Sequence, residues 1–365
     1  MDLYRALARP LLFSFDAEWI HNRTLDASAA FGATAVGRKL LRNLFAYDDP
    51  RLHTHVAGLS FANPLGLAAG FDKNGRAIRA LDALGFGSVE VGSVSAHSSQ
   101  GNAKPRLFRL PDDEAIVVNY GVPNEGAQAV AHRVRGRSLS GRLGINLVET
   151  NTGCALADDA VVAEFVEAVR PFCGIADYIA LNLNCPNTTG GRSPFDDASL
   201  LRTLMLEYAR IEALPPVFLK FTAHADGQRM DAMLRAIEGC DFVRGFIFNL
   251  PSGTDYRLHS PSATLAQMPG TLCGPPTQER MDEALRFWYR HIDRQRHAIV
   301  GSGGIRTAAD AYRKIRLGAS LLQLYTALVY SGPSLVEQIN RGLVEHLERD
   351  GLERIDQAVG LDNSR

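Results

Sequence analysis

Short apolar runs alternate with helical stretches from residue 60 onward, and this alternation restricts the fold more than any other feature. Eight such runs are present, most ending in Gly, Asn, Ser, Thr or Lys: 66–70, 88–93, 144–148, 178–183, 217–222, 245–250, 298–303 and 321–328. Strands that alternate with helices form parallel sheets. Eight units predict an α/β fold of the closed (β/α)8 TIM-barrel type, with its active site at the carboxyl ends of the strands. An open doubly wound sheet is the alternative, but no GxGxxG motif follows the first predicted strand.

Residues 1–45 form a predicted N-terminal helical extension, separate from a barrel domain at 46–365. The first part carries one apolar stripe at helical spacing: Leu3, Leu7, Leu11, Phe15 and Trp19. A second apolar segment at 31–45 contains basic residues, and Asp26 or Ser28 is the expected cap of its helix. Two interpretations stay open: a lid packed on the barrel, or an apolar vestibule at a membrane surface.

Composition excludes several classes of function. The chain has 39 Lys and Arg residues and 40 Asp and Glu residues, so it carries no excess positive charge that would favour binding to a nucleic acid. The five cysteines contain no CxxC pair, and the histidines form no HExxH motif, so we expect no metal site. Neither a signal peptide nor a long apolar span is evident. We therefore expect a cytoplasmic protein or one held peripherally at the cytoplasmic face of a membrane. The Pro- and Gly-rich stretch 251–276 is predicted to be a long loop.

Polar side chains follow several predicted strands and should meet at one face. Lys73 comes after the first strand, and Asn146 stands in the third. Asn182 and Asn184 should share one face of the fourth strand, with Asn187 on the loop beyond. Surface salt bridging of Lys73 and an Asx-type turn are the structural alternatives. Amides and a thiol buried together without partners are costly, which favours a ligand site.

Later strands add a cation and a glycine-rich turn. Lys220 ends the fifth predicted strand among apolar neighbours, where it can hold negative charge on a ring such as a flavin, and Asn249 ends the sixth. The motif Gly301-Ser302-Gly303-Gly304 leads into a helix, and Tyr325 and Thr326 follow the eighth strand. Loops at these two places in a barrel often bind phosphate.

Together these residues resemble the dihydroorotate dehydrogenases, flavin enzymes of pyrimidine synthesis. The resemblance runs from about residue 4 to residue 345. Its most specific segments are NPLGLAAGFDKNG (63–75), GNAKPRLFRL (101–110), NLNCPNT (182–188) and LYTAL (324–328). The N-terminal helical pair and GNAKPRLFRL look like the membrane-associated, quinone-reducing class 2 enzymes.

The resemblance implies FMN as cofactor, a small-molecule substrate and a quinone partner. The positions that match FMN contacts are Ala69, Gly70, Ser93, Asn146, Asn182, Lys220, Gly274, Gly303, Gly304, Tyr325 and Thr326. The positions that match substrate contacts are Lys73, Asn182, Asn187 and Asn249. His21 and Arg109 match the quinone tunnel. Cys185 matches the catalytic base, and Lys220 would stabilise reduced flavin.

Several positions depart from the family pattern. Cys185 stands where class 2 enzymes usually have serine, as in the soluble class 1 enzymes. Val118 replaces a substrate-binding asparagine, Leu250 replaces a Thr or Ser, and Phe248 replaces a threonine near the flavin. Asn119 is displaced by one residue and should face the other way in a strand.

The sequence thus predicts FMN-dependent oxidation of dihydroorotate to orotate, with a quinone as electron acceptor. An FMN-dependent paralogue that acts on another cyclic amide or unsaturated acid is the main alternative, favoured by Val118 and Leu250. A soluble enzyme that uses fumarate and a non-catalytic flavin-binding or membrane-associated protein are the others. Cys185 favours the fumarate enzyme, and the N-terminal extension disfavours it.

Overall fold

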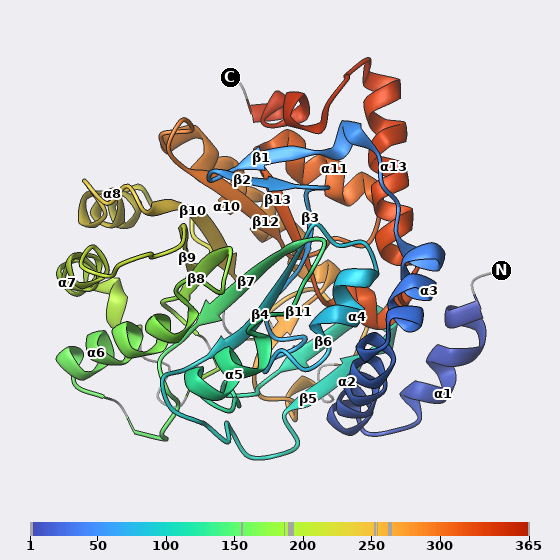
Figure 1. Ribbon diagram of the computed structural model, residues 1–365, viewed down its shortest axis with the longest axis horizontal. Coiled ribbons are helices and arrows are strands. Elements are labelled where there is room, and N and C mark those ends of the chain that lie inside the picture. The colour runs from blue at the N-terminus through green and yellow to red at the C-terminus, as the bar shows by residue number, and fades with distance from the viewer. Residues whose placement is uncertain are drawn as a thin grey trace.

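Eight parallel strands close into a barrel, which confirms the predicted fold (Figure 1). The computed structural model describes residues 3–154, 156–185, 187–188, 193–251, 253, 255–261 and 265–363. Around the barrel the strand order is β10–β12–β13–β3–β4–β7–β8–β9. The strands are β3 (Leu65–Leu67), β4 (Ser88–Val94), β7 (Arg142–Leu147), β8 (Tyr178–Asn182), β9 (Val217–Thr222), β10 (Val243–Asn249), β12 (Ala298–Ser302) and β13 (Leu321–Leu324).

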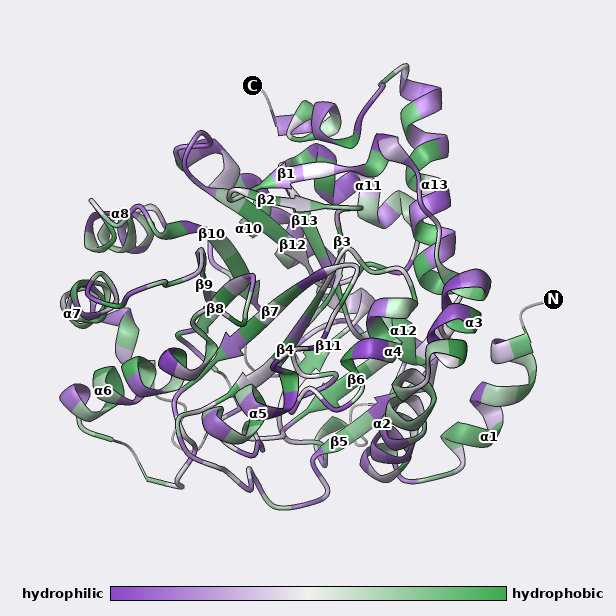
Figure 2. Cartoon of the chain, in the orientation of Figure 1, coloured by the Kyte–Doolittle hydropathy of each residue, from purple (hydrophilic) through white to green (hydrophobic). Residues whose placement is uncertain are grey.

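Helices surround the barrel and bury one apolar face each. On α10, the buried Met281, Leu285 and Trp288 recur at helical spacing. Figure 2 shows hydrophobic residues along the barrel strands and mixed character on the helices around them. These helices are α4 (Ile78–Ala83), α5 (Ala127–Val134), α6 (Asp158–Val169), α7 (Ala198–Tyr208), α8 (Gly227–Ala236), α10 (Gln278–His291), α11 (Ala308–Leu317), α12 (Thr326–Ser331) and α13 (Leu335–Asp350).

The eighth strand is shorter than predicted. It ends at Leu324, and the following residues form α12 instead of continuing the strand to 328. An apolar run of this length is compatible with either structure by periodicity alone. Asn184 is a second correction, because β8 already ends at Asn182. The Asn184 side chain donates to Asp196 Oδ1 at 2.8 Å and does not line the cavity at the carboxyl ends of the barrel strands (the mouth cavity), which Asn182 does line.

An antiparallel sheet that the sequence did not reveal packs near the barrel mouth. It consists of β5 (Leu107–Leu110), β6 (Ala115–Val118) and β11 (Thr271–Cys273) in the order β11–β6–β5. β11 lies within the stretch 251–276, so that stretch is not the uninterrupted loop that was predicted. Residues 252, 254 and 262–264 of it lie outside the described residues.

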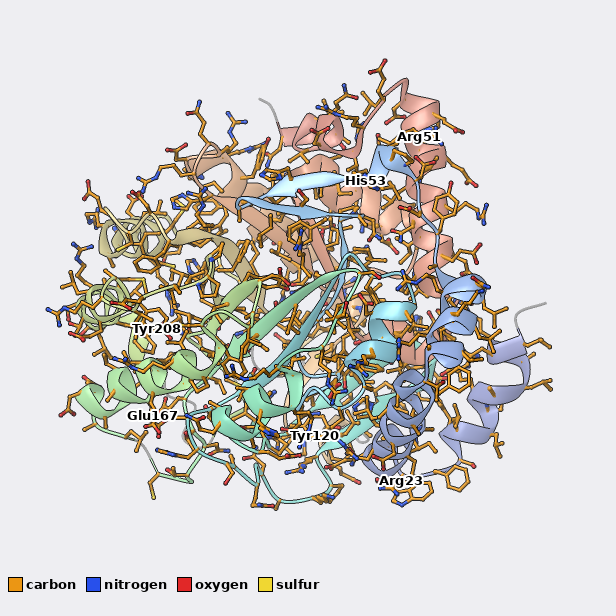
Figure 3. The ribbon with its side chains drawn as sticks, in the orientation of Figure 1. Arg23, Arg51, His53, Tyr120, Glu167 and Tyr208 are labelled. Atoms are coloured by element: carbon orange, nitrogen blue, oxygen red, sulfur yellow. The ribbon has the colours of Figure 1, made fainter. Side chains whose placement is uncertain are left out.

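A hairpin of β1 (Thr54–Val56) and β2 (Leu59–Phe61) closes the opposite end of the barrel. Val56 and Phe61 pack with apolar residues from the starts of the barrel strands. Just before the hairpin, Arg51 bonds both Asp49 and Glu348 of α13 (Figure 3). Apolar side chains therefore fill the amino end of the barrel, and the candidate site is sought at the other end.

The N-terminal segment contains more helix than the predicted pair. A π-helical turn at Tyr4–Ala8 leads into α1 (Arg9–Phe13), followed by α2 (Ala17–Ala33) and α3 (Ala35–Phe45). Asp16 caps α2 and Thr34 caps α3, so the expected caps Asp26 and Ser28 are wrong because both lie inside α2. α2 and α3 pack against α4. Across the described residues, no helix combines the length and apolar character needed to cross a membrane.

Candidate functional site

A cavity of about 220 Å³ opens at the carboxyl ends of the barrel strands. It gathers most of the predicted site residues, because parallel strands in a barrel end at the same face. These lining residues are Ala69, Gly70, Ser93, Asn182, Cys185, Asn187, Lys220, Asn249, Gly274, Gly303, Gly304, Tyr325 and Thr326. Asn146 and Lys73 lie beside this cavity, and His21 and Arg109 line a second one.

Amide and hydroxyl side chains form a continuous chain across the floor of the mouth cavity. Ser93 Oγ donates to Asn146 Oδ1 at 2.5 Å and accepts from Asn182 Nδ2 at 3.3 Å. Asn249 Nδ2 donates to Asn182 Oδ1 at 2.6 Å and to the carbonyl oxygen of Asn184 at 2.8 Å. Residues from four strands thus hold one another in fixed orientation, which is what a preorganised site requires.

Glu90 anchors this hydrogen-bonded row of side chains through its buried carboxylate. Its fully buried carboxylate accepts from Asn146 Nδ2 at 2.9 Å, from Tyr178 Oη at 3.2 Å and from Gln323 Nε2 at 2.6 Å. Gln323 lines the cavity, and its Oε1 is buried without a partner in the described structure. A buried acceptor without a partner is costly, so we expect it to meet a donor from a bound ligand.

The glycine-rich turn after β12 lies at one end of the cavity. Gly303 and Gly304 have φ values of +78° and +75°, which other residues rarely adopt. A Cβ on Gly304 would also lie 2.5 Å from Gln278 Cβ. α11 follows with a capping box of Thr307 and Asp310. This strand–turn–helix arrangement exposes backbone N–H groups suited to a phosphate.

Cys185, on the loop after β8, and Lys220, on β9, face the same cavity. Burial raises the pKa of the Cys185 thiol, although nearby backbone N–H groups and Lys220 act in the opposite direction. Thr188 Oγ1 donates to the Cys185 carbonyl oxygen at 3.1 Å and so constrains the turn after the thiol. Lys220 lies within β9, two residues before the strand ends, and not at its end as predicted.

Lys73 stands beside the mouth cavity. Its Nζ donates to the Gly70 carbonyl oxygen at 2.9 Å and lies 3.8 Å from the centroid of the Tyr120 ring. Burial lowers the pKa of Lys73 to about 8. Tyr120, labelled in Figure 3, lines the cavity with its hydroxyl buried and without a partner in the described structure. Lys73 would therefore supply a positive charge to a small anionic group bound beside it.

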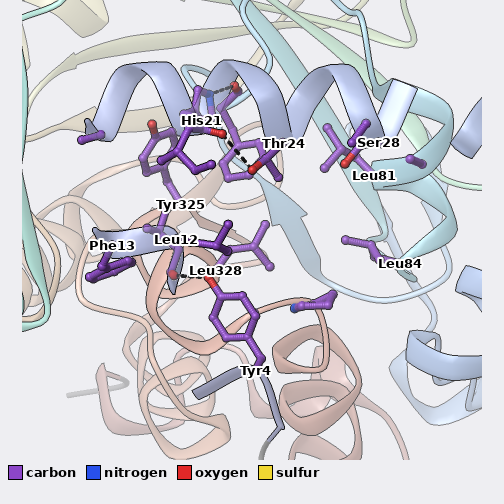
Figure 4. A pocket seen from close by; sticks show the side chains of 18 of the residues that line it. Tyr4, Leu12, Phe13, His21, Thr24, Ser28, Leu81, Leu84, Tyr325 and Leu328 are labelled. Atoms are coloured by element: carbon purple, nitrogen blue, oxygen red, sulfur yellow. Dashed lines mark hydrogen bonds between the residues drawn. The ribbon is translucent and has the colours of Figure 1, made fainter. Parts of the chain in front are cut away.

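A second, mainly apolar cavity of about 480 Å³ lies beneath α2. Figure 4 shows His21 and Thr24 above it on α2, and Tyr325 and Leu328 across from them. His21 Nε2 bonds the Phe71 carbonyl oxygen at 2.8 Å, and burial followed by the charge of Lys73 lowers the pKa of His21 to about 4. The imidazole is therefore neutral at pH 7, with Nε2 as its donor.

Arg109 closes another side of this second cavity. Its guanidinium donates to the carbonyl oxygens of Leu12 and Phe13, each at 3.3 Å, and to that of Phe15. Tyr325 lines both cavities. A ligand in the mouth cavity and another beneath α2 would therefore be separated by little more than one side chain.

Comparison with known proteins identifies the family. The family model for dihydroorotate dehydrogenase matches residues 51–347. The chain belongs to this family. A relative from Roseiflexus sp. (strain RS-1) is 40% identical over 363 residues, covering 98% of each chain, and one from Gloeobacter violaceus is 40% identical over 364 residues, covering 99% of each. Both are named dihydroorotate dehydrogenase (quinone). The crystal structure of the Eimeria tenella enzyme with ferulenol matches with a TM-score of 0.82 and 28% identity, covering 96% of each chain.

The positions that depart from the dihydroorotate dehydrogenase pattern line the mouth cavity. Val118, Phe248 and Leu250 all face it and carry no polar group. Asn119 follows the last residue of β6 and does not line the cavity, and its Oδ1 accepts from Asn102 Nδ2 at 3.0 Å. It therefore does not replace the missing amide at position 118.

Three residues of this site escaped the sequence analysis: Glu90, Gln323 and Thr271. The first two interrupt apolar strands, in SVEVGSV and LLQL, and a charged or amide residue inside such a run is a usable signal. Thr271 gave no such signal, because its strand was hidden in a Pro- and Gly-rich stretch. Its hydroxyl is within hydrogen-bonding distance of Asn187.

Proposed function

We propose that this chain oxidises dihydroorotate to orotate and passes the electrons to a quinone. The observation that carries the proposal is the pair of cavities that meet at Tyr325, one polar with a thiol and a lysine, the other apolar beneath the N-terminal helices. Family membership and the quinone-specific names of the full-length relatives support it. Oxidation and electron release can then use separate ligand sites, as two half-reactions require.

FMN is the flavin that the residues of the mouth cavity fit. Gly303 and Gly304 precede α11 and offer backbone N–H groups to a phosphate. The buried Gln323 Oε1 lacks a partner and could accept from a ring N–H, while Lys220 lies where it can balance negative charge on the ring. When bound, FMN supplies the acceptor for a hydride from the substrate and later gives up the electrons.

Cys185 is the proposed base, and three residues are proposed to hold the substrate. As thiolate, Cys185 removes the proton from the carbon next to the ring carbonyl, while the neighbouring carbon loses hydride. Lys73 offers a cation to the carboxylate. Asn187 and Asn249 line the cavity and present amide groups to the ring. No metal ligand set of three or more acidic, His or Cys side chains occurs among the described residues.

The cavity beneath α2 is the proposed quinone site, lined by the neutral imidazole of His21 and the cationic guanidinium of Arg109. Exposed apolar side chains on the helices around it favour peripheral contact with the cytoplasmic face of a membrane: Leu3, Leu7, Leu11, Phe15, Trp19, Phe31, Val36, Leu40 and Leu44. We accordingly assign residues 1–45 to a quinone and membrane vestibule and residues 46–365 to the catalytic barrel.

A stepwise spectroscopic experiment tests this function. Dihydroorotate is added to the purified protein without oxygen, and the visible flavin absorbance is followed. Prompt bleaching is expected, followed by recovery when a quinone is added but not when fumarate is added. If fumarate restores the flavin absorbance and a quinone does not, the electron acceptor would be soluble fumarate and not a quinone.

A paralogue acting on another cyclic amide or unsaturated acid is the second candidate. Val118 and Leu250 favour it, because both line the mouth cavity and neither can hydrogen-bond a substrate. A flavin that stays oxidised with dihydroorotate, but bleaches with another compound from a panel of such substrates, would support this candidate.

A further inference from the structure

Thr271 lies across from Val118 at the edge of the mouth cavity. β11 and β6 pair antiparallel, and their register sets Thr271 opposite Val118. Side chains at directly opposite positions lie on the same face of a sheet, about 4.5–5.5 Å apart at Cβ. Both residues line the cavity, and Thr271 is only 3% exposed. A hydroxyl therefore stands beside the apolar position 118.

The amides on this side of the cavity have few free hydrogen-bonding groups. Both Nδ2 donors of Asn249 go to Asn182 and Asn184, which leaves its oxygen for a ligand. Asn119 is bonded to Asn102 outside the cavity. Val118 and Leu250 have no polar side-chain atom. A cyclic amide bound here would leave N–H and C=O groups without partners unless other side chains supply them.

Thr271 is positioned to supply such a group in two ways. Its Oγ1 donates to Asn187 Oδ1 at 3.1 Å. With its oxygen engaged, Asn187 keeps Nδ2 as a donor for a substrate carbonyl. The Thr271 hydroxyl itself retains lone pairs that can accept from a substrate N–H. The Asn187 backbone is also held, since its carbonyl oxygen accepts from Asn102 Nδ2 at 2.9 Å.

We propose that Thr271 is a specificity-determining residue for the cyclic-amide edge of the substrate. Its hydroxyl orients Asn187 and accepts a hydrogen bond from the substrate, and so takes over the polar role that position 118 lacks. The inference rests on the proposed function, because it names the contacts of the same substrate. It adds a contact from the sheet that packs near the barrel mouth, outside the barrel strands.

The test compares Thr271→Val, which removes the hydroxyl at nearly constant volume, with Thr271→Ser, which keeps it. Calorimetric titration should show orotate binding weakened on the order of tenfold or more in Thr271→Val, and near the wild-type value in Thr271→Ser. KM for dihydroorotate should rise in parallel. Thr54→Val, the same change in the β1–β2 hairpin at the opposite end of the barrel, should leave orotate binding unchanged. Thr271→Val should also retain wild-type flavin content and wild-type reoxidation of dithionite-reduced flavin by quinone.

The controls separate the two levels of the proposal. Wild-type orotate affinity in Thr271→Val would overturn the role of Thr271 and leave the proposed function intact. A wild-type protein that neither binds orotate nor bleaches with dihydroorotate would overturn both. If Thr271→Val purifies without flavin, Thr271→Ala and Thr271→Ser form the deciding pair, and equal orotate affinity in these two would reject the inference.

Discussion

Cys185, the proposed base, lies in a place that disfavours its charged form. The thiol faces the mouth cavity, and burial raises its pKa above the usual range. Under this proposal the thiolate removes the proton, and the raised pKa would leave only a small fraction of the enzyme in that form near neutral pH. The flavin-bleaching rate with saturating dihydroorotate should therefore rise with pH through about 8.5, the ordinary thiol value, and beyond it.

Replacement of Cys185 separates the half-reactions. Cys185→Ala should slow bleaching by dihydroorotate roughly 10²–10⁴-fold, the usual contribution of a positioned general base. Reoxidation of dithionite-reduced flavin by quinone should stay at the wild-type rate, because the thiol lies in the mouth cavity and does not line the one beneath α2. Full turnover in Cys185→Ala would reject this residue as the base.

His21 should make the protein sensitive to mild acid. Burial lowers its pKa from 6.5 to about 4 in the folded state. Between these values the unfolded chain binds the proton first, so the free energy of unfolding falls as pH decreases from 6.5 towards 4. His21→Gln keeps a donor for the Phe71 carbonyl oxygen but cannot titrate. From pH 7 to pH 4.5 the wild type should lose about 2 kcal/mol more than this variant in denaturant titrations. Equal losses would show that His21 is accessible to protons.

At the scale of elements, one buried ion pair ties the N-terminal helices to the segment before β5. Arg106, which is 7% exposed, donates from Nη2 to Glu18 Oε1 of α2 at 2.8 Å. Arg106 also donates to the carbonyl oxygens of Gln100 and Asn102. Although burial alone would raise it, the Glu18 pKa is lowered by the hydrogen bond and charge of Arg106. This pair is thus one of the contacts that hold α2 over the second cavity, together with the packing of α2 against α4.

Removal of one member of a buried ion pair leaves the other charge buried without a partner, which strongly destabilises the folded state. Glu18→Ala should lower the free energy of unfolding by about 3–5 kcal/mol. Glu337→Ala, which breaks the exposed Glu337–Arg341 pair within α13, should cost no more than about 0.5 kcal/mol. Chemical denaturation of both variants measures the difference. Similar small losses would mean that the Glu18–Arg106 pair contributes little to the packing of α2.

The elements that could be predicted from the sequence are those in which apolar residues follow a clear pattern and a polar residue marks the end of the run. All eight barrel strands were located, and β9 matched its predicted bounds, because apolar runs ended in polar residues. β5, β6 and β11 were missed because these strands of three or four residues fall outside the strand–helix alternation that located the equally short β3 and β13. Among side chains, strand ends predicted the cavity lining well. Contacts such as Thr271 with Asn187 join segments far apart in sequence, and no local pattern encodes them.

At the scale of the whole molecule, the proposed function places the two ligands in two cavities with different surroundings. The mouth cavity would take a polar substrate from water, while the cavity beneath α2 borders helices with exposed apolar residues. Tyr325 lies between them. Figure 1 shows α1, α2 and α3 gathered on one side of the barrel, next to α4 and α13. A long-tailed quinone could therefore reach the second cavity from a lipid surface without crossing water.

A triple replacement on this side tests whether the apolar residues meet lipid. Leu7, Leu11 and Trp19 are 67%, 64% and 51% exposed, so their change to serine should leave the core intact. Sedimentation with phospholipid vesicles should fall at least about tenfold, because each side chain buries apolar area in the membrane. Turnover with a long-tailed quinone should fall too, whereas turnover with a short, water-soluble quinone and bleaching by dihydroorotate should persist. Leu206→Ser, at a residue of α7 that is 48% exposed, should change none of these measurements. If the triple variant still binds vesicles, the residues that contact the membrane would lie outside α1 and the start of α2.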